Sequence, residues 1–214
     1  METHTGRRRP PRFELHGDVL CLDFVNTLDD RPSEKPKELL RSYIDLARFA
    51  EDTGILGETR VDALRKRSLM DPEAAQHVLL AAIELREAMY AIFRAIMRKE
   101  PAPAMALAQL NAYVQDAAQH SRLVETTGRF EWRFDDPSSF EDILWPIARS
   151  AADLLASEQL KFVRACSSKT CQWLFLDMSR NHRRRWCKMN LCGNRAKARR
   201  FYARQKESAP GKPA

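Results

Sequence analysis

Two cysteine pairs mark the stretch that decides how the C-terminal part of this chain folds. The first pair reads Cys166-Ser-Ser-Lys-Thr-Cys171, and the second reads Cys187-Lys-Met-Asn-Leu-Cys192 and continues as Gly-Asn-Arg195. Structural zinc sites typically use paired cysteines separated by two to four residues, because four thiolates then surround Zn²⁺ as a tetrahedron. We therefore predict one structural Zn²⁺ per chain. A four-cysteine site leaves no open position, so a catalytic zinc is not expected.

Other interpretations of these cysteines stay open at the level of sequence. Four buried thiols can act as small hydrophobic side chains, and His182 could replace one cysteine as a ligand. A redox pair is also conceivable, but C-x4-C differs from the C-x-x-C of thioredoxin-like sites. The fifth cysteine, Cys21, lies in an apolar stretch and is expected in the core.

Charge is distributed unevenly along the 214 residues. The whole chain carries +7, but residues 161–206 hold 14 Lys and Arg against the single acid Asp177, which gives +13. Residues 207–214 are neutral, so residues 1–160 carry −6. An acidic body with a basic C-terminal module indicates two separate tasks. The basic module is expected to bind a polyanion.

A basic helix is expected over residues 194–205, directly after the last cysteine. Its sequence contains neither Pro nor Gly, and one side gathers Ala198, Phe201 and Tyr202, which we expect to pack on the zinc module. The other side is cationic. A second basic run precedes Cys187. The predicted nucleic-acid contacts are Arg183, Arg184, Arg185, Lys188, Arg195, Lys197, Arg199, Arg200 and Arg204. A solvated charge run, an acidic protein partner and an anionic membrane surface are the alternatives.

The N-terminal region reads as mainly α-helical with a small β component. Apolar stripes at helical spacing predict helices near residues 39–53, 61–68, 72–96 and 103–117, and another helix starts at Asp136. Alternation around Phe130, Trp132 and Phe134 predicts a β-hairpin, and Pro146 is expected to kink or divide the last helix. We divide the chain into a disordered start (1–12), a helical domain (13–158), a finger (159–207) and a disordered tail (208–214).

One apolar stretch near the N-terminus carries two polar residues that require an explanation. Residues 18–26 are short, apolar and β-branched, which predicts a strand. Asp23 and Asn26 lie on it or just after it. They are candidate contacts for a small-molecule ligand, or they satisfy nearby backbone groups, as Asp and Asn often do.

The cysteine-rich segment resembles the CGNR zinc-finger family, whose name matches Cys192-Gly-Asn-Arg195. The similarity extends back through Cys171-Gln-Trp-Leu-Phe-Leu-Asp177 to Cys166. The stretch Leu22-Asp-Phe-Val-Asn-Thr27, after Gly17-Asp18, is similar to the ABATE domain that accompanies this finger. The resemblance implies a treble-clef or zinc-ribbon-like finger with Cys166, Cys171, Cys187 and Cys192 as ligands. It also implies a bacterial, stress-related transcription regulator. Lys188 departs from the family pattern, in which serine is common.

Together these observations predict a DNA-binding transcription regulator whose N-terminal domain senses a small-molecule effector or forms a homodimer. An RNA-binding or protein-interaction factor that uses the same basic face is the alternative, followed by a small-molecule enzyme in the helical domain. We expect no enzyme, because no nucleotide-binding loop, H-E-x-x-H motif or catalytic triad is recognisable. We expect a cytoplasmic protein that does not bind membranes and is nucleoid-associated when bound, because no segment resembles a signal peptide or a membrane span.

Overall fold

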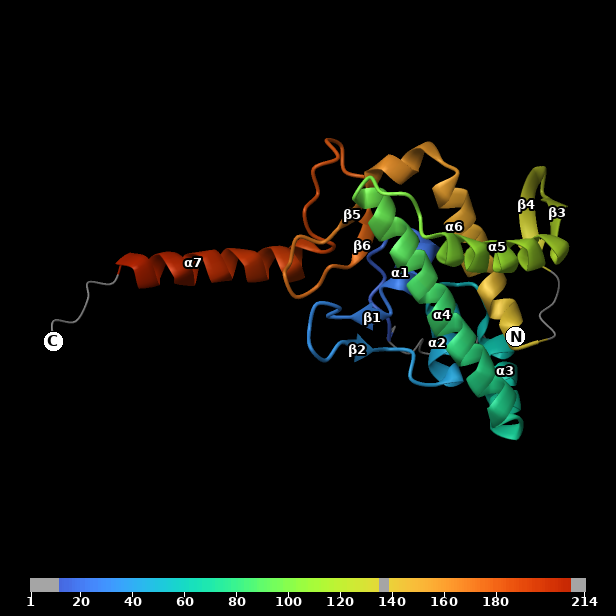
Figure 1. The fold of residues 1–214 in the computed structure, drawn as a ribbon. Coiled ribbons are helices and arrows are strands. Elements are labelled where there is room, and N and C mark those ends of the chain that lie inside the picture. The colour runs from blue at the N-terminus through green and yellow to red at the C-terminus, as the bar shows by residue number, and fades with distance from the viewer. Residues whose placement is uncertain (1–11, 135–138, 209–214) are drawn as a thin grey trace, which may run out of the picture.

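The computed structural model describes residues 12–134 and 139–208, and the predictions for residues 1–11, 135–138 and 209–214 lie outside that range. The mainly helical fold with a small β component is confirmed, and the described residues form three small two-stranded antiparallel sheets. Figure 1 shows long helices packed around a central core, with one helix extending away from it. None of the helices in the described ranges is both long and apolar enough to cross a membrane.

The stretch predicted as a strand is instead the short helix α1 (Leu20–Val25). Four of its six residues are buried, namely Cys21, Leu22, Phe24 and Val25. Helix α1 packs against helices α4 (Pro72–Met97) and α6 (Leu144–Leu155) and strand β6 (Leu174–Leu176). In a short segment that is buried on several sides, polar residues do not recur at a regular spacing. The sequence pattern therefore cannot distinguish a strand from a helix. Burial of Cys21 in the core is confirmed. The adjoining hairpin pairs β1 (Leu28–Asp29) with β2 (Lys37–Glu38).

The next helices follow the sequence signals closely. Helix α2 (Tyr43–Asp52) starts after Ser42, whose hydroxyl accepts a hydrogen bond from a backbone N–H in the first turn. Helix α3 (Glu58–Met70) buries Val61, Leu64 and Ser68, as predicted. Helix α4 (Pro72–Met97) starts at the predicted Asp-Pro signal, with the Asp71 carboxylate accepting from the Ala74 N–H at 3.1 Å.

The helix predicted near residues 103–117 is α5 (Ala104–Gln119). Leu110 and Ala117 of its apolar stripe are buried, whereas Leu107 of the same stripe is exposed. The predicted hairpin is confirmed as β3 (Ser121–Thr126) and β4 (Arg129–Phe134). Residues 135–138, where the next helix was expected to start, lie outside the described residues; the first described turn is η1 (Glu141–Ile143).

Helix α6 (Leu144–Leu155) carries Pro146 in its first turn, so the predicted kink or division is wrong. Proline fits this position because the first turn of a helix needs no backbone N–H donor. After α6 the chain makes a short 3-10 turn, η2 (Glu158–Phe162), and enters β5 (Val163–Ala165), which pairs with β6 (Leu174–Leu176). A π-helical turn, η3 (Met189–Gly193), leads into α7 (Asn194–Ser208). This order of hairpin, loop and helix matches the predicted treble-clef-like finger.

Packing continues across the boundary that we placed between residues 158 and 159. Val163, Leu174 and Leu176 belong to the same buried cluster as the N-terminal helices. A second, smaller cluster holds the four paired cysteines with Trp173 and Phe175. The hairpin β5–β6 therefore contributes to both cores, and the finger is built directly onto the helical body.

Helix α7 does not pack as the sequence analysis predicted. It runs away from the body (red in Figure 1), and Phe201 and Tyr202 are 58% and 63% exposed. Their rings contact each other, with centroids 5.8 Å apart. Among the described residues, α7 makes its main contacts with η3, so the zinc module does not cover Phe201 and Tyr202.

Candidate metal centre

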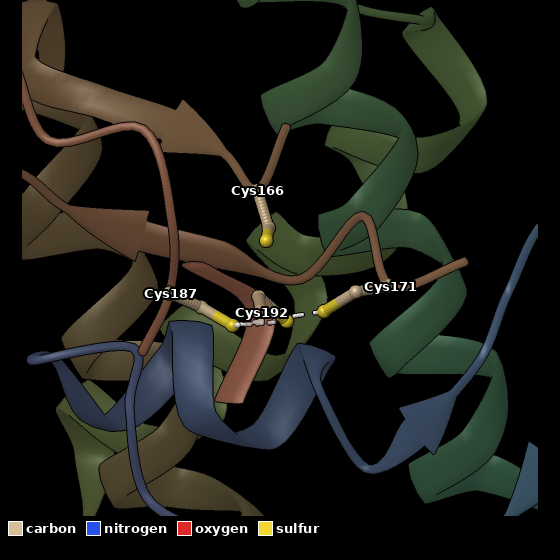
Figure 2. Close-up of side chains that lie close together, drawn as sticks. All are labelled: Cys166, Cys171, Cys187 and Cys192. Carbon is tan, nitrogen blue, oxygen red and sulfur yellow. Dashed lines mark hydrogen bonds between the residues drawn. The ribbon is translucent and has the colours of Figure 1, made fainter. Parts of the chain in front are cut away.

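Four sulfur atoms converge at the junction of the finger loops (Figure 2). The side chains of Cys166, Cys171, Cys187 and Cys192 are all buried, and their sulfurs lie within 4.8 Å of one another. The Sγ atoms of Cys171 and Cys187 are 3.6 Å apart, and those of Cys187 and Cys192 are 3.7 Å apart. Two ligands at the Zn–S distance of about 2.3 Å lie about 3.8 Å apart in a tetrahedron. The donor set and its spacing therefore fit one structural Zn²⁺.

Backbone hydrogen bonds place each cysteine pair. The Cys166 N–H donates to the Trp173 carbonyl at 2.8 Å, which continues the β5–β6 pairing up to the first ligand. The Ser167 N–H donates to the Arg185 carbonyl at 2.8 Å and so joins the first cysteine turn to the segment before Cys187. The Cys192 N–H donates to the Lys188 carbonyl at 3.0 Å within η3. These backbone bonds hold the two cysteine pairs in place without involving the sulfur atoms.

Gly193, directly after the last cysteine, lies in a closely packed position. A Cβ atom at this position would lie 2.4 Å from the Met189 Sδ and 3.2 Å from the Trp186 ring. A larger residue would therefore displace the Met189 side chain and press against the Trp186 ring. Asn194 then opens α7, and its side-chain amide donates to the Asn190 carbonyl at 3.1 Å. The Gly-Asn pair of the motif thus shapes the turn that carries Cys192.

The sulfur cluster distributes its protons unevenly. Hydrogen bonds from Cys171 and Cys187 lower the pKa of the Cys166 thiol. The same contacts raise the pKa of Cys171, because its proton is held between sulfurs in a buried setting. When Zn²⁺ binds, all four sulfurs act as thiolates and the centre has a net charge of −2. Lys188 directly follows the ligand Cys187 in the sequence, and its positive charge is of the sign that would offset part of that charge.

His182, the alternative ligand, does not face the cluster. Its Nδ1 atom lies 2.7 Å from the Asp177 carbonyl, and its ring stacks on Phe162 with centroids 3.8 Å apart. Asp177 itself is fully buried and orders the loop before the second cysteine pair. Its carboxylate accepts hydrogen bonds from the Ser179 N–H and hydroxyl and from the Arg184 N–H. Burial opposes ionisation, but these bonds hold the pKa of Asp177 below its usual value.

The fold and this site define a zinc-finger protein in which a four-cysteine centre is fused to a helical domain. Residues 18–158 match the family model ABATE, described as "Putative stress-induced transcription regulator". Residues 163–205 match the CGNR zinc finger. The chain belongs to the ABATE family and carries a CGNR zinc finger with one structural zinc. A comparison with curated proteins found no match.

The predicted nucleic-acid contacts divide into groups in the structure. Arg195, Lys197 and Arg199 are exposed on α7, and Arg183 is exposed before Cys187. Arg185 is also exposed, with its guanidinium 5.3 Å from the centre of the Trp186 ring, and Lys188 is half-buried. Arg200 and Arg204 lie within α7, but their side chains fall outside the described part of the structure.

Arg184 differs from its neighbours because its guanidinium is already engaged. It contacts the Asp18 carboxylate at 2.5 Å, and its Nε donates to the Trp186 carbonyl at 3.0 Å. It also donates to the Cys187 carbonyl, and the Phe175 ring lies beneath it at 4.4 Å. We therefore assign Arg184 a positioning role: it ties the second cysteine pair to the N-terminal segment. Sequence reasoning missed this because Asp18 is 166 residues away.

Asp23 and Asn26 face protein groups. The Asp23 carboxylate accepts from the Gly17 N–H at 2.7 Å, and burial raises the pKa of Asp23 to about 6. The Asn26 amide donates to the Leu174 carbonyl and accepts from the Leu174 N–H, both at 2.8 Å. Both contacts agree with the alternative that these side chains satisfy nearby backbone groups. Asn26 thus joins α1 to the finger strand β6.

Proposed function

We propose that this chain binds DNA through the basic face of α7 and acts as a transcription regulator. The proposal rests on the exposure of the Lys and Arg side chains that the structure describes on α7 and on their lack of ion pairs among the described residues. Arg195, Lys197 and Arg199 are exposed, and within the described residues none of them forms an ion pair with a carboxylate. Unpaired cations on one helix are the usual electrostatic footprint of a polyanion-binding surface.

The placement of α7 supports a groove-binding role. The helix has 15 residues, which corresponds to a length of about 22 Å, and it extends away from the body rather than packing along it (Figure 1). The major groove of B-DNA is about 12 Å wide and admits an α-helix. Duplex RNA is a weaker candidate, because its major groove is deep and too narrow for side chains to read.

The zinc centre and the family support the regulatory part of the proposal. The metal fixes η3, from which α7 emerges, so the basic helix has a defined direction relative to the body. Residues 1–160 carry a net charge of −6, which does not favour DNA binding by the N-terminal domain. We propose that it forms a homodimer and responds to a small-molecule effector, since one short helix reads only a few base pairs.

Salt titration of duplex DNA binding tests the proposal. If about five cations per finger contact phosphates, the slope of log K against log salt is near −4.5. The double variant Arg195→Ala/Arg199→Ala should weaken binding and flatten the slope by about 1.8. The matched control Lys35→Ala/Lys37→Ala removes two exposed charges from the β1–β2 region and should leave both values unchanged. Wild-type DNA affinity in the α7 variant, with zinc still bound, would overturn the proposal.

A further inference from the structure

A basic hollow lies beside the zinc centre, separate from the exposed length of α7. Its volume is about 540 Å³, and its walls are formed by His16 together with the continuous run of residues 183–189. The family match assigns no role to this hollow. It is within the size range of sites for ligands larger than a bare anion, which runs from about 300 to 1,000 Å³.

The backbone carbonyl groups of this run already accept hydrogen bonds from the protein. The carbonyl of Arg185 accepts from Ser167, and those of Trp186 and Cys187 accept from the Arg184 guanidinium. The Lys188 carbonyl accepts from the backbone N–H groups of Cys192 and Gly193. Four consecutive carbonyl oxygens are therefore committed to internal hydrogen bonds. Their partial negative charge is therefore partly offset by protein donors.

The lining side chains are of two kinds. Arg183, Arg185 and Lys188 are cationic, and the lining residues include no carboxylate. Arg184 also lines the hollow, but its guanidinium is paired with the Asp18 carboxylate, so it supplies neither a free donor nor an unpaired charge. Trp186 and Met189 make up the apolar wall, on which the Arg185 guanidinium lies 5.3 Å from the Trp186 ring centre, and Met189 is exposed. Aromatic and thioether surfaces accept flat rings, and base–aromatic stacking is tolerant of base identity.

We propose that this hollow binds a single nucleotide unit, with its phosphate on Arg183, Arg185 and Lys188 and its base against Trp186 and Met189. The chemistry fits an unpaired nucleotide of a nucleic-acid strand and a free mononucleotide equally well. The choice of a nucleic-acid strand as the ligand rests on the proposed function, in which α7 binds DNA. The turn η3 connects the hollow to the first turn of α7. A strand could then contact both places at once.

Calorimetric titration of the full-length zinc-loaded protein tests this inference. The probes are adenosine 5′-monophosphate, inorganic phosphate and a short single-stranded oligodeoxyadenylate. We expect the mononucleotide to bind more tightly than phosphate, because only the nucleotide reaches the apolar wall. The double variant Arg183→Ala/Arg185→Ala should weaken nucleotide binding at least tenfold, since each lost charge-assisted hydrogen bond is worth about that factor. Zinc content, measured in parallel, shows whether the variant is still folded.

Two comparisons separate this inference from the proposed function. The α7 variant Arg195→Ala/Arg199→Ala should keep its mononucleotide affinity while it loses duplex affinity, and Lys35→Ala/Lys37→Ala should keep both. If the protein binds the oligonucleotide much more tightly than the mononucleotide, the natural ligand is a nucleic-acid strand. Equal affinities identify the free nucleotide as the ligand. The inference is overturned if no nucleotide binds, if phosphate binds as tightly as the nucleotide, or if the hollow variant binds like the wild type. None of these results depends on whether α7 binds duplex DNA.

Discussion

Asn26, which follows the last residue of α1, and Leu174 of β6, 148 residues apart in the chain, are joined by two hydrogen bonds of 2.8 Å. The amide of Asn26 pairs with the backbone N–H and carbonyl of Leu174 as a neighbouring strand would. Both groups are buried, so water cannot replace either bond. This pair, together with the Leu176 N–H that donates to the Gly17 carbonyl at 2.9 Å, holds the finger hairpin against the N-terminal domain.

Replacing Asn26 should therefore destabilise the whole chain. Asn26→Ala leaves the buried backbone groups of Leu174 without partners, at a cost of about 1–3 kcal/mol for each. We expect the free energy of unfolding to fall by about 2–4 kcal/mol, measured by urea denaturation. Asn111→Ala on the exposed face of α5 is the control and should change stability by less than about 0.5 kcal/mol. An Asn26→Ala variant as stable as the control would show that the two hydrogen bonds to Leu174 do not stabilise the fold.

Loss of zinc should affect more than the finger. We expect one zinc per chain by elemental analysis, and Cys187→Ser should abolish it, because metal binding in small modules supplies folding free energy. Since Val163, Leu174 and Leu176 lie in the main core, circular dichroism should show lower thermal stability of the helical body as well. Cys21→Ala, which changes a buried cysteine outside the cluster, should keep one zinc. Metal-free wild-type protein from an unchelated preparation would contradict the site.

Stability should depend on the ionisation of Asp23. Burial raises the pKa of Asp23 to about 6, from an ordinary value near 3.8, and the nearby Asp18 carboxylate acts in the same direction. The folded state thus favours the protonated form, so this stabilising contribution is complete below pH ~3.8 and is lost as pH rises through ~6. The total change is at most about 3 kcal/mol.

Asp23→Asn tests this sign, because its amide oxygen can still accept from the Gly17 N–H. We expect the variant to be more stable than the wild type above pH ~6 and to lose the decrease in unfolding free energy between pH ~4 and ~6. Denaturation at a series of pH values measures both. The other titratable or charged residues near Asp23 are His16, Asp18 and Arg184, and all are unchanged in the variant. Parallel pH curves for the two proteins would show that Asp23 does not titrate in this range.

The β3–β4 hairpin is our candidate for the surface that holds a dimer together. Register places Leu123 opposite Trp132 and Glu125 opposite Phe130, so Leu123, Phe130 and Trp132 share one face. All three are exposed, with Phe130 at 68%, and an apolar cluster of this kind usually marks an interaction site. We expect sedimentation to show a dimer of the wild type and a monomer of Phe130→Asp. A wild type that is monomeric both free and on DNA would rule this surface out.

The metal site and most of the helices could be predicted from local sequence. Each of the patterns involved spans only a few residues, so it can be recognised without knowledge of the tertiary structure. These patterns are the spacing of the cysteine ligands, the helix start at Asp71-Pro72 and the alternation around Trp132. The segment 18–26 could not be assigned in this way, because burial on several sides removes the polar period that distinguishes helix from strand. The packing of α7 was also predicted wrongly, since helical spacing shows which residues share a face but not whether another element covers it.

The sequence by itself determined that two cysteine pairs make a zinc finger, that the finger is basic and that helices precede it. Only the tertiary structure decided how the finger is joined to those helices. The contacts that do this, Asn26 with Leu174 and Asp18 with Arg184, connect residues about 150 positions apart or more. Polar side chains at such separations leave no periodic pattern in the sequence. Their partners are set by the packing of α1 against β6, which brings buried backbone groups within hydrogen-bond distance.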